Sequence, residues 1–118
     1  MARNHSIDIG TLTILSGNNA SDALKMNQMP LRGLSVFSPA ALDGVVTVEV
    51  SGDFADPVPT WQKLQSGGAD VVVGAVQCVP LDFVGWDAFR LASDAGGGET
   101  ADRDFKLKGV EDLQGGFA

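Results

Sequence analysis

The segment 45–51 reads Val-Val-Thr-Val-Glu-Val-Ser, and from Val46 onward it alternates apolar with polar side chains. The same alternation returns at 89–91 (Phe-Arg-Leu) and at 105–107 (Phe-Lys-Leu). A period of two places alternate side chains on opposite faces of a β-strand. Each segment therefore predicts a strand with one buried and one solvated face, as in an antiparallel sheet.

Working outward from these segments, we expect about eight strands, spaced at the roughly 8–12-residue interval of a sandwich or barrel. They are predicted at residues 7–15, 34–38, 45–51, 61–64, 71–73, 77–83, 86–92 and 105–108. Gly10 interrupts the first of them and predicts a bend or bulge inside one long strand. Residues 23–29 are expected to be irregular or an edge strand, because Pro30 limits a helix there.

The predicted fold is therefore all-β: an antiparallel β-sandwich, or a jelly-roll-like relative of it, in a single domain that spans residues 1–118. Residues 1–10 are expected to form an extended N-terminal arm, and residues 110–118 a C-terminal tail with weak patterning. A chain of 118 residues is long enough to close one hydrophobic core. Fifteen glycines and five prolines supply the turns that many short strands require.

The alternation also predicts which side chains fill the core. The expected inward residues are Ile14, Val36, Val46, Val48, Val50, Val72, Phe89, Leu91, Phe105 and Leu107. Phe37 and Phe83 fall on apolar faces as well, and Trp61 and Trp86 are expected to pack in the core or at its rim. Cys78 lies between apolar neighbours and is expected to be a small buried residue.

The charge and the cysteine count limit the classes of partner. The formal net charge of −7 repels phosphate backbones and anionic lipid, so we expect neither nucleic acid nor a membrane as a partner. Cys78 is the only cysteine, which rules out an intrachain disulfide. The start of the chain lacks the apolar core of a secretory signal, and we expect synthesis in a cytoplasm.

The carboxylates and the single histidine do not form a catalytic pattern. His5 is the only histidine and lies in the expected arm, so a Ser-His-Asp triad has no evident support. Asp43, Asp53, Asp56 and Asp70 lack the ligand spacing of a calcium loop. Glu49, Asp82 and Asp87 are expected at strand ends rather than as a glycosidase pair. We therefore expect no enzymatic activity, no cofactor and no required metal.

The segment 94–99 reads Asp-Ala-Gly-Gly-Gly-Glu and is the most conspicuous local motif. A phosphate-binding loop would need a lysine and a serine or threonine at fixed spacing after the glycines, and these are missing. The acidic flanks would also repel phosphate. We expect residues 94–102 to form a mobile loop between two strands.

Four segments follow one another along the chain: Val45-Val-Thr-Val-Glu-Val-Ser, then, after a proline-containing loop, Thr60-Trp-Gln-Lys-Leu-Gln-Ser-Gly-Gly, Trp86-Asp-Ala-Phe-Arg-Leu-Ala-Ser and Ala101-Asp-Arg-Asp-Phe-Lys-Leu-Lys-Gly. In this order they resemble small virion proteins of tailed bacteriophages, in particular the capsid decoration (cement) proteins. The likeness covers roughly residues 34–109. It implies a non-enzymatic all-β protein, commonly a homotrimer, that binds the major capsid protein on the outside of the assembled head.

Six residues are candidates for contacts with a partner. Arg3, His5, Ile7 and Ile9 lie in the expected arm, where the alternating isoleucines suit addition of a strand to a neighbour's sheet. Phe54 and Phe117 do not alternate into a strand, and an aromatic ring without a core role is a contact candidate. Two alternatives stay open: a tail, fibre-base or head-completion virion protein, and a carbohydrate- or calcium-binding β-sandwich module.

Overall fold

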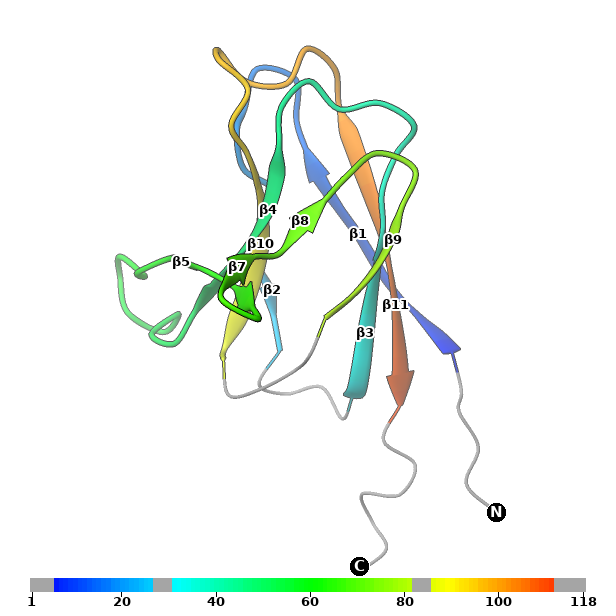
Figure 1. Ribbon diagram of the computed structural model, residues 1–118. Coiled ribbons are helices and arrows are strands. Elements are labelled where there is room, and N and C mark those ends of the chain that lie inside the picture. The colour runs from blue at the N-terminus through cyan, green and yellow to red at the C-terminus, as the bar shows by residue number, and fades with distance from the viewer. Residues whose placement is uncertain (1–5, 27–30, 82–85, 112–118) are drawn as a thin grey trace, which may run out of the picture.

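The computed structural model describes residues 6–26, 31–81 and 86–111, and it is an all-β sandwich of antiparallel sheets (Figure 1). The strands in these ranges are β1 Ser6–Ile14, β2 Leu24–Lys25, β3 Leu31–Phe37, β4 Val46–Ser51, β5 Gln62–Lys63, β6 Gln65–Ser66, β7 Ala69–Asp70, β8 Val72–Val73, β9 Cys78–Leu81, β10 Ala88–Ser93 and β11 Arg103–Glu111. No helix that could cross a membrane occurs in the described ranges. The prediction of an all-β sandwich is confirmed.

Two sheets form the layers of the sandwich. One has the strand order β1-β11-β3-β9, and the other has the order β2-β10-β4-β5, with β8 also pairing with β4. The chain crosses from one layer to the other at nearly every connection, so β1, β3, β9 and β11 alternate along the sequence with β2, β4 and β10 (Figure 1). Most strand neighbours are consequently far apart in sequence.

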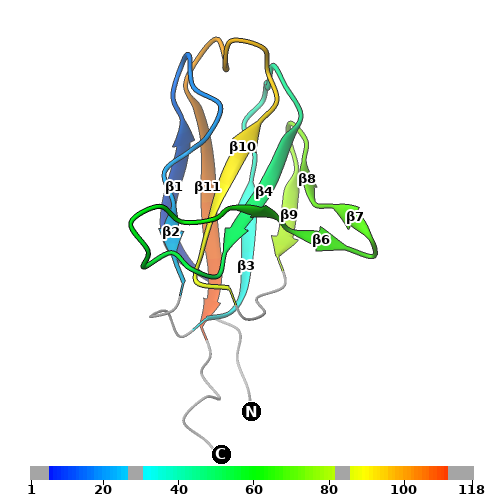
Figure 2. The same cartoon turned by 90° about the vertical axis from the view of Figure 1, so that its left-hand side faces the viewer.

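One position in the second sheet is shared by two short strands. Lys63 of β5 lies opposite Glu49, and Val72 of β8 lies opposite Thr47, so β5 and β8 follow the same edge of β4. Between them, Leu64 and Val71 continue the hydrogen bonding to Val48. The β6–β7 hairpin is inserted at this point and projects away from both sheets (Figure 2).

The core lies between the two sheets and includes most of the side chains that alternation predicted. Phe89, Leu91, Phe105 and Leu107 are at most 1% exposed, and Trp86 packs edge-on against Phe89 with ring centroids 5.7 Å apart. Burial of a side chain of this size stabilises the fold by roughly 1.5–3 kcal/mol. Ile14, Val36, Val46 and Val48 complete the predicted set of fully buried residues. Met26, next to β2, is also buried, although its surroundings in sequence show no periodicity.

The bulge predicted in the first strand is present. The pairing of β1 with β11 shifts register between Asp8 and Gly10, and Gly10 has a φ of 136°. Residues with a Cβ seldom adopt that conformation, which explains the glycine. The short strand β2 agrees with the expected edge strand in residues 23–29, of which residues 27–29 lie outside the described ranges.

β11 is longer than expected, and β1 takes in part of the predicted N-terminal arm. Ser6–Gly10 belong to β1 rather than to a free arm, because Ser6, Ile7 and Asp8 pair with Val110, Gly109 and Lys108. Val110 and Glu111 likewise belong to β11 and not to the tail. The prediction placed the first strand one residue too late, at 7–15, and it underestimated β11 because Gly109 interrupts the apolar pattern.

Several predicted core positions are wrong in detail. Val73 is fully buried and Val72 is 48% exposed, so the register expected for this strand is off by one residue. Phe37 is 40% exposed, because it lies on the outer face of β3 next to the buried Val36. Cys78, opposite Phe37 on β9, is exposed rather than buried. Val50 is partly buried and packs against the core, as its predicted inward position implies, and Phe83 lies outside the described ranges.

Candidate functional site

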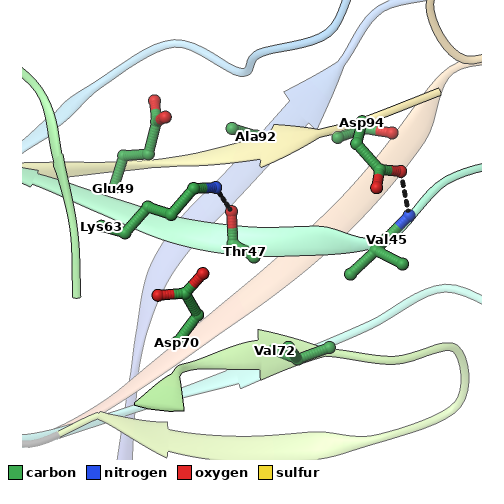
Figure 3. A pocket seen from close by; sticks show the side chains of 9 residues that line it. Val45, Thr47, Glu49, Lys63, Asp70, Val72, Ala92 and Asp94 are labelled. Atoms are coloured by element: carbon green, nitrogen blue, oxygen red, sulfur yellow. Dashed lines mark hydrogen bonds between the residues drawn. The ribbon is translucent and has the colours of Figure 1, made fainter. Parts of the chain in front are cut away.

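A surface depression lies on the outer face of the second sheet, over β4 and the end of β10 (Figure 3). It has a volume of about 310 Å³ and is walled on one side by the segment that carries β5, β7 and β8. Its lining residues are Val45, Thr47, Glu49, Lys63, Asp70, Val72, Ala92, Ser93 and Asp94. We call it the β4 hollow.

The polar groups of the β4 hollow are largely used to hold neighbouring segments of the sandwich. Lys63 Nζ donates a hydrogen bond to Thr47 Oγ1 at 3.1 Å, and Asp94 Oδ1 accepts one from the Val45 backbone N–H at 2.6 Å (Figure 3). Glu49 pairs with Arg90 at 2.8 Å. No histidine or cysteine lines the hollow. The arrangement therefore offers hydrogen bonds to a small polar group.

An aromatic–cation stack lies beside the hollow. The Arg90 guanidinium is 4.4 Å from the centroid of the Trp61 ring, and Phe54 meets the same ring edge-on at a centroid distance of 5.8 Å. Arg90 also forms an ion pair with Glu49. One face of Trp61 is thus covered by Arg90, so that face is not available to stack on a sugar ring.

A buried carboxylate lies at the end of the sandwich where the 38–45 and 94–102 loops meet. Glu99 is 1% exposed and accepts hydrogen bonds from the backbone N–H groups of Asp43 and Gly44 and from the Ser93 hydroxyl. Its Oε1 also lies 3.0 Å from Arg103 Nε. Such a buried charge is tolerated because donors surround it.

The carboxylates of this network are held ionised. Burial alone would raise the pKa of Glu99, but the hydrogen bonds from Asp43, Ser93, Arg103 and Gly44 outweigh it and lower that pKa below its usual value. Hydrogen bonds from the Thr100 backbone and hydroxyl, and then from Arg103, lower the pKa of Asp43 to about 2. Both acids therefore carry a charge at neutral pH and clamp the two loops together.

This network corrects the prediction of a mobile 94–102 loop. Hydrogen bonds join the loop to neighbouring segments. The Gly17 backbone N–H, for example, donates one to the Glu99 carbonyl at 2.7 Å. Sequence reasoning treated the three glycines as a sign of mobility and missed Glu99. The available signal was an acidic residue flanked by glycine and threonine, four residues before Arg103, but nothing local revealed its donors.

Three of the six predicted contact residues lie in the part of the chain that the structure describes. Ile7 and Ile9 lie in β1 and are partly buried, with Ile9 packed against the core. Phe54 packs on Trp61 in the 52–61 loop, so its ring has a local partner. Arg3, His5 and Phe117 lie outside the described residues.

Asp43, Glu49, Asp53 and Asp70, among the carboxylates weighed for metal binding or glycoside hydrolysis, have structural partners. Asp53 accepts hydrogen bonds from the Thr60 N–H and the Ser51 hydroxyl, which lower its pKa. Asp82 lies outside the described residues. In the ranges that the structure describes, no group of three acidic, histidine or cysteine side chains is placed to hold a metal ion.

Comparisons with known proteins give no relative. No protein-family model matches the chain, and neither the curated proteins nor the solved structures contain a match.

Proposed function

We propose that this chain is a non-enzymatic virion protein of a tailed bacteriophage, most closely a capsid decoration (cement) protein that binds the outside of the head shell. Its partners are then the major capsid protein and other copies of itself, and it is made in the host cytoplasm. Three of the four segments that carry the family resemblance coincide with β4, β10 and β11, which pack on one another through the core.

The position of the two chain ends is the observation that carries the proposal. Ser6 lies opposite Val110, so the first described strand begins where the last one is ending. Residues 1–5 and 112–118 are therefore attached at neighbouring points of one end of the sandwich. They carry Arg3, His5 and Phe117, and a single partner surface can engage both segments at once. Two weak contacts on one subunit reinforce each other by raising the effective concentration.

The charge of the protein is in keeping with a protein partner on the outside of the shell. With 15 acidic and 8 basic residues, the surface repels the packaged nucleic acid and has no attraction to anionic lipid. The resemblance further implies self-association as a trimer, and the mass of the pure protein in solution tests that number.

The test is co-sedimentation with shells assembled from the major capsid protein of the same phage. We expect the full chain to sediment with the shells and to raise the temperature at which they disassemble. Removal of residues 1–5 or 112–118, or Phe117→Ala, should weaken this binding at least tenfold. Truncation must stop before Ser6, because residues 6–9 are part of β1 and their loss would damage the sandwich.

Lys63→Ala is the matched control, because Lys63 lies in the β4 hollow and far from the chain ends in sequence. It should leave shell binding unchanged, and circular dichroism should show that every variant keeps its strands. A full chain that never sediments with shells contradicts the proposal. Sedimentation with isolated tails in place of heads would favour the alternative of a tail, fibre-base or head-completion protein.

A further inference from the structure

The outer edge of β1 is long, and none of the described strands pairs with it. β1 is the terminal strand of its sheet and bonds only to β11 (Figure 2). From Gly10 to Ile14 its pairing with β11 runs without a register shift. In the described ranges, no backbone hydrogen bond outside this ladder involves Ser6–Ile14. The other side of the strand thus presents a row of backbone donors and acceptors.

Proteins usually protect such edges, and the other edges in this sandwich are protected. β9 has only four residues and contains Pro80, while β2 and β5 have two residues each. β1 has nine residues and no proline, lysine or arginine. In the described ranges its protection consists of the charge of Asp8 and the bulge between Asp8 and Gly10, and both leave the second half of the strand regular.

The unprotected half is also neutral and apolar. Residues 9–15 read Ile-Gly-Thr-Leu-Thr-Ile-Leu and contain no ionisable side chain in a chain of net charge −7. Two copies repel each other overall, so a neutral strip is where they can approach at the lowest electrostatic cost. Leu15 follows the strand directly and is 52% exposed, which adds apolar surface beside the edge.

We propose that the free edge of β1 pairs with β1 of a second copy, antiparallel about a two-fold axis at Leu12. In this register Leu12 of one copy lies opposite Leu12 of the other. Thr11 of each copy lies opposite Thr13 of the other copy. The pairing is isologous and closed, so it joins two copies and stops. Thr–Thr pairs are favourable across antiparallel strands, and the register opposes no like charges.

The pairing joins two four-stranded sheets into one sheet of eight strands. Only five residues of each copy contribute, so we expect a weak contact that depends on concentration. It gives assemblies of even number: two copies, or six if a separate three-fold contact also forms. The inference concerns the pure protein and does not depend on binding to shells.

Charge substitutions at Thr11 and Thr13 test the register. Thr11→Glu with Thr13→Lys places opposite charges across both cross-strand pairs, and within one chain these side chains face Lys106 and Asp104. We expect this double variant to dimerise about fivefold more tightly than the parent chain. Thr11→Glu with Thr13→Glu places like charges across the same pairs and should weaken dimerisation by about fivefold or more.

The measurement is sedimentation equilibrium of the full chain over a range of concentrations up to millimolar. Thermal melting checks that each variant folds. If the second glutamate, facing Asp104, proves too destabilising, the Thr11→Glu, Thr13→Lys variant, whose side chains face Lys106 and Asp104, still tests the register. A mass of one chain or three chains at all concentrations overturns the inference, as does an even-numbered assembly that responds to neither double variant. Shell binding is measured separately through the chain ends, so the two proposals fail independently.

Discussion

Glu99 illustrates how a single residue can join segments that the sequence keeps apart. Its buried carboxylate accepts hydrogen bonds from Asp43, Gly44, Ser93 and Arg103. These bonds take the place of those that the donors in the two loops would otherwise make to water. Removing one member of such a network leaves the others buried and unpaired, which costs more than the bond itself is worth. The network therefore determines whether the 94–102 loop is ordered.

The lowered pKa values of Asp43 and Glu99 predict how stability depends on pH. A carboxyl group whose pKa is lower in the folded state stabilises the protein above its unfolded pKa, and this contribution is lost as the pH falls through the folded value. With unfolded values of 3.8 and 4.5 and a folded Asp43 value of about 2, the melting temperature should fall between about pH 4.5 and pH 2.

Asp43→Asn should flatten this pH dependence, and it should lower the melting temperature at pH 7, because the amide accepts fewer hydrogen bonds from Thr100 and Arg103. Asp56→Asn, in the exposed 52–59 loop, is the control and should reproduce the parent curve. Differential scanning calorimetry at several pH values makes the comparison. An Asp43→Asn curve as steep as that of the parent would contradict the role of this carboxylate.

At the scale of elements, the 94–102 loop depends on one glycine more than on the others. Gly98 has a φ of 88°, and a Cβ there would collide with the backbone carbonyl of Gly17. Gly96, in the same loop, has no atom within 4 Å of the position that its Cβ would occupy. The two glycines therefore differ in what they require: Gly98 must lack a side chain so that the 15–19 loop can approach closely. Gly96 is part of the connection between the strands and has room for a side chain.

Gly98→Ala should destabilise the protein by about 1–3 kcal/mol, through the left-handed backbone and the collision with Gly17. Gly96→Ala should change the free energy of unfolding by less than about 1 kcal/mol in either direction, because space is available. Urea unfolding followed by tryptophan fluorescence measures both. Equal losses in the two variants would show that the loop does not require this contact.

At the scale of the whole molecule, stability comes from one core that both sheets share. Phe89 of β10 and Phe105 of β11 are fully buried, and the two strands belong to different layers. Because the chain crosses between layers at nearly every connection, the paired strands of the described sandwich that directly follow one another along the chain are β4–β5 and β6–β7. Local hairpins therefore contribute little to holding the fold.

Phe89→Ala should lower the free energy of unfolding by about 3–5 kcal/mol, since the side chain is fully buried and its removal leaves a cavity against Trp86. Phe37→Ala is the matched control, and its cost should be about 1 kcal/mol or less because the ring is 40% exposed on the outer face. Chemical unfolding of both variants gives the comparison. Similar costs for the two rings would mean that the core is not where the structure places it.

The sequence by itself determined the elements that a local pattern can encode. Alternation identified β4, β10 and the centre of β11 and most of their buried side chains, because neighbouring residues of a strand must face opposite sides. Gly10 predicted the bulge in β1, because only the conformational freedom of glycine suits that backbone.

Only the tertiary structure decided which strands pair and which polar residues are buried. β1 pairs with β11 across almost the whole chain, and Glu99 finds donors near residue 43. No local pattern specifies such contacts, because they depend on how the two layers close. The same closure incorporates residues 6–10 into the sheet and exposes Phe37 and Cys78. It also leaves the outer edge of β1 without a strand beside it.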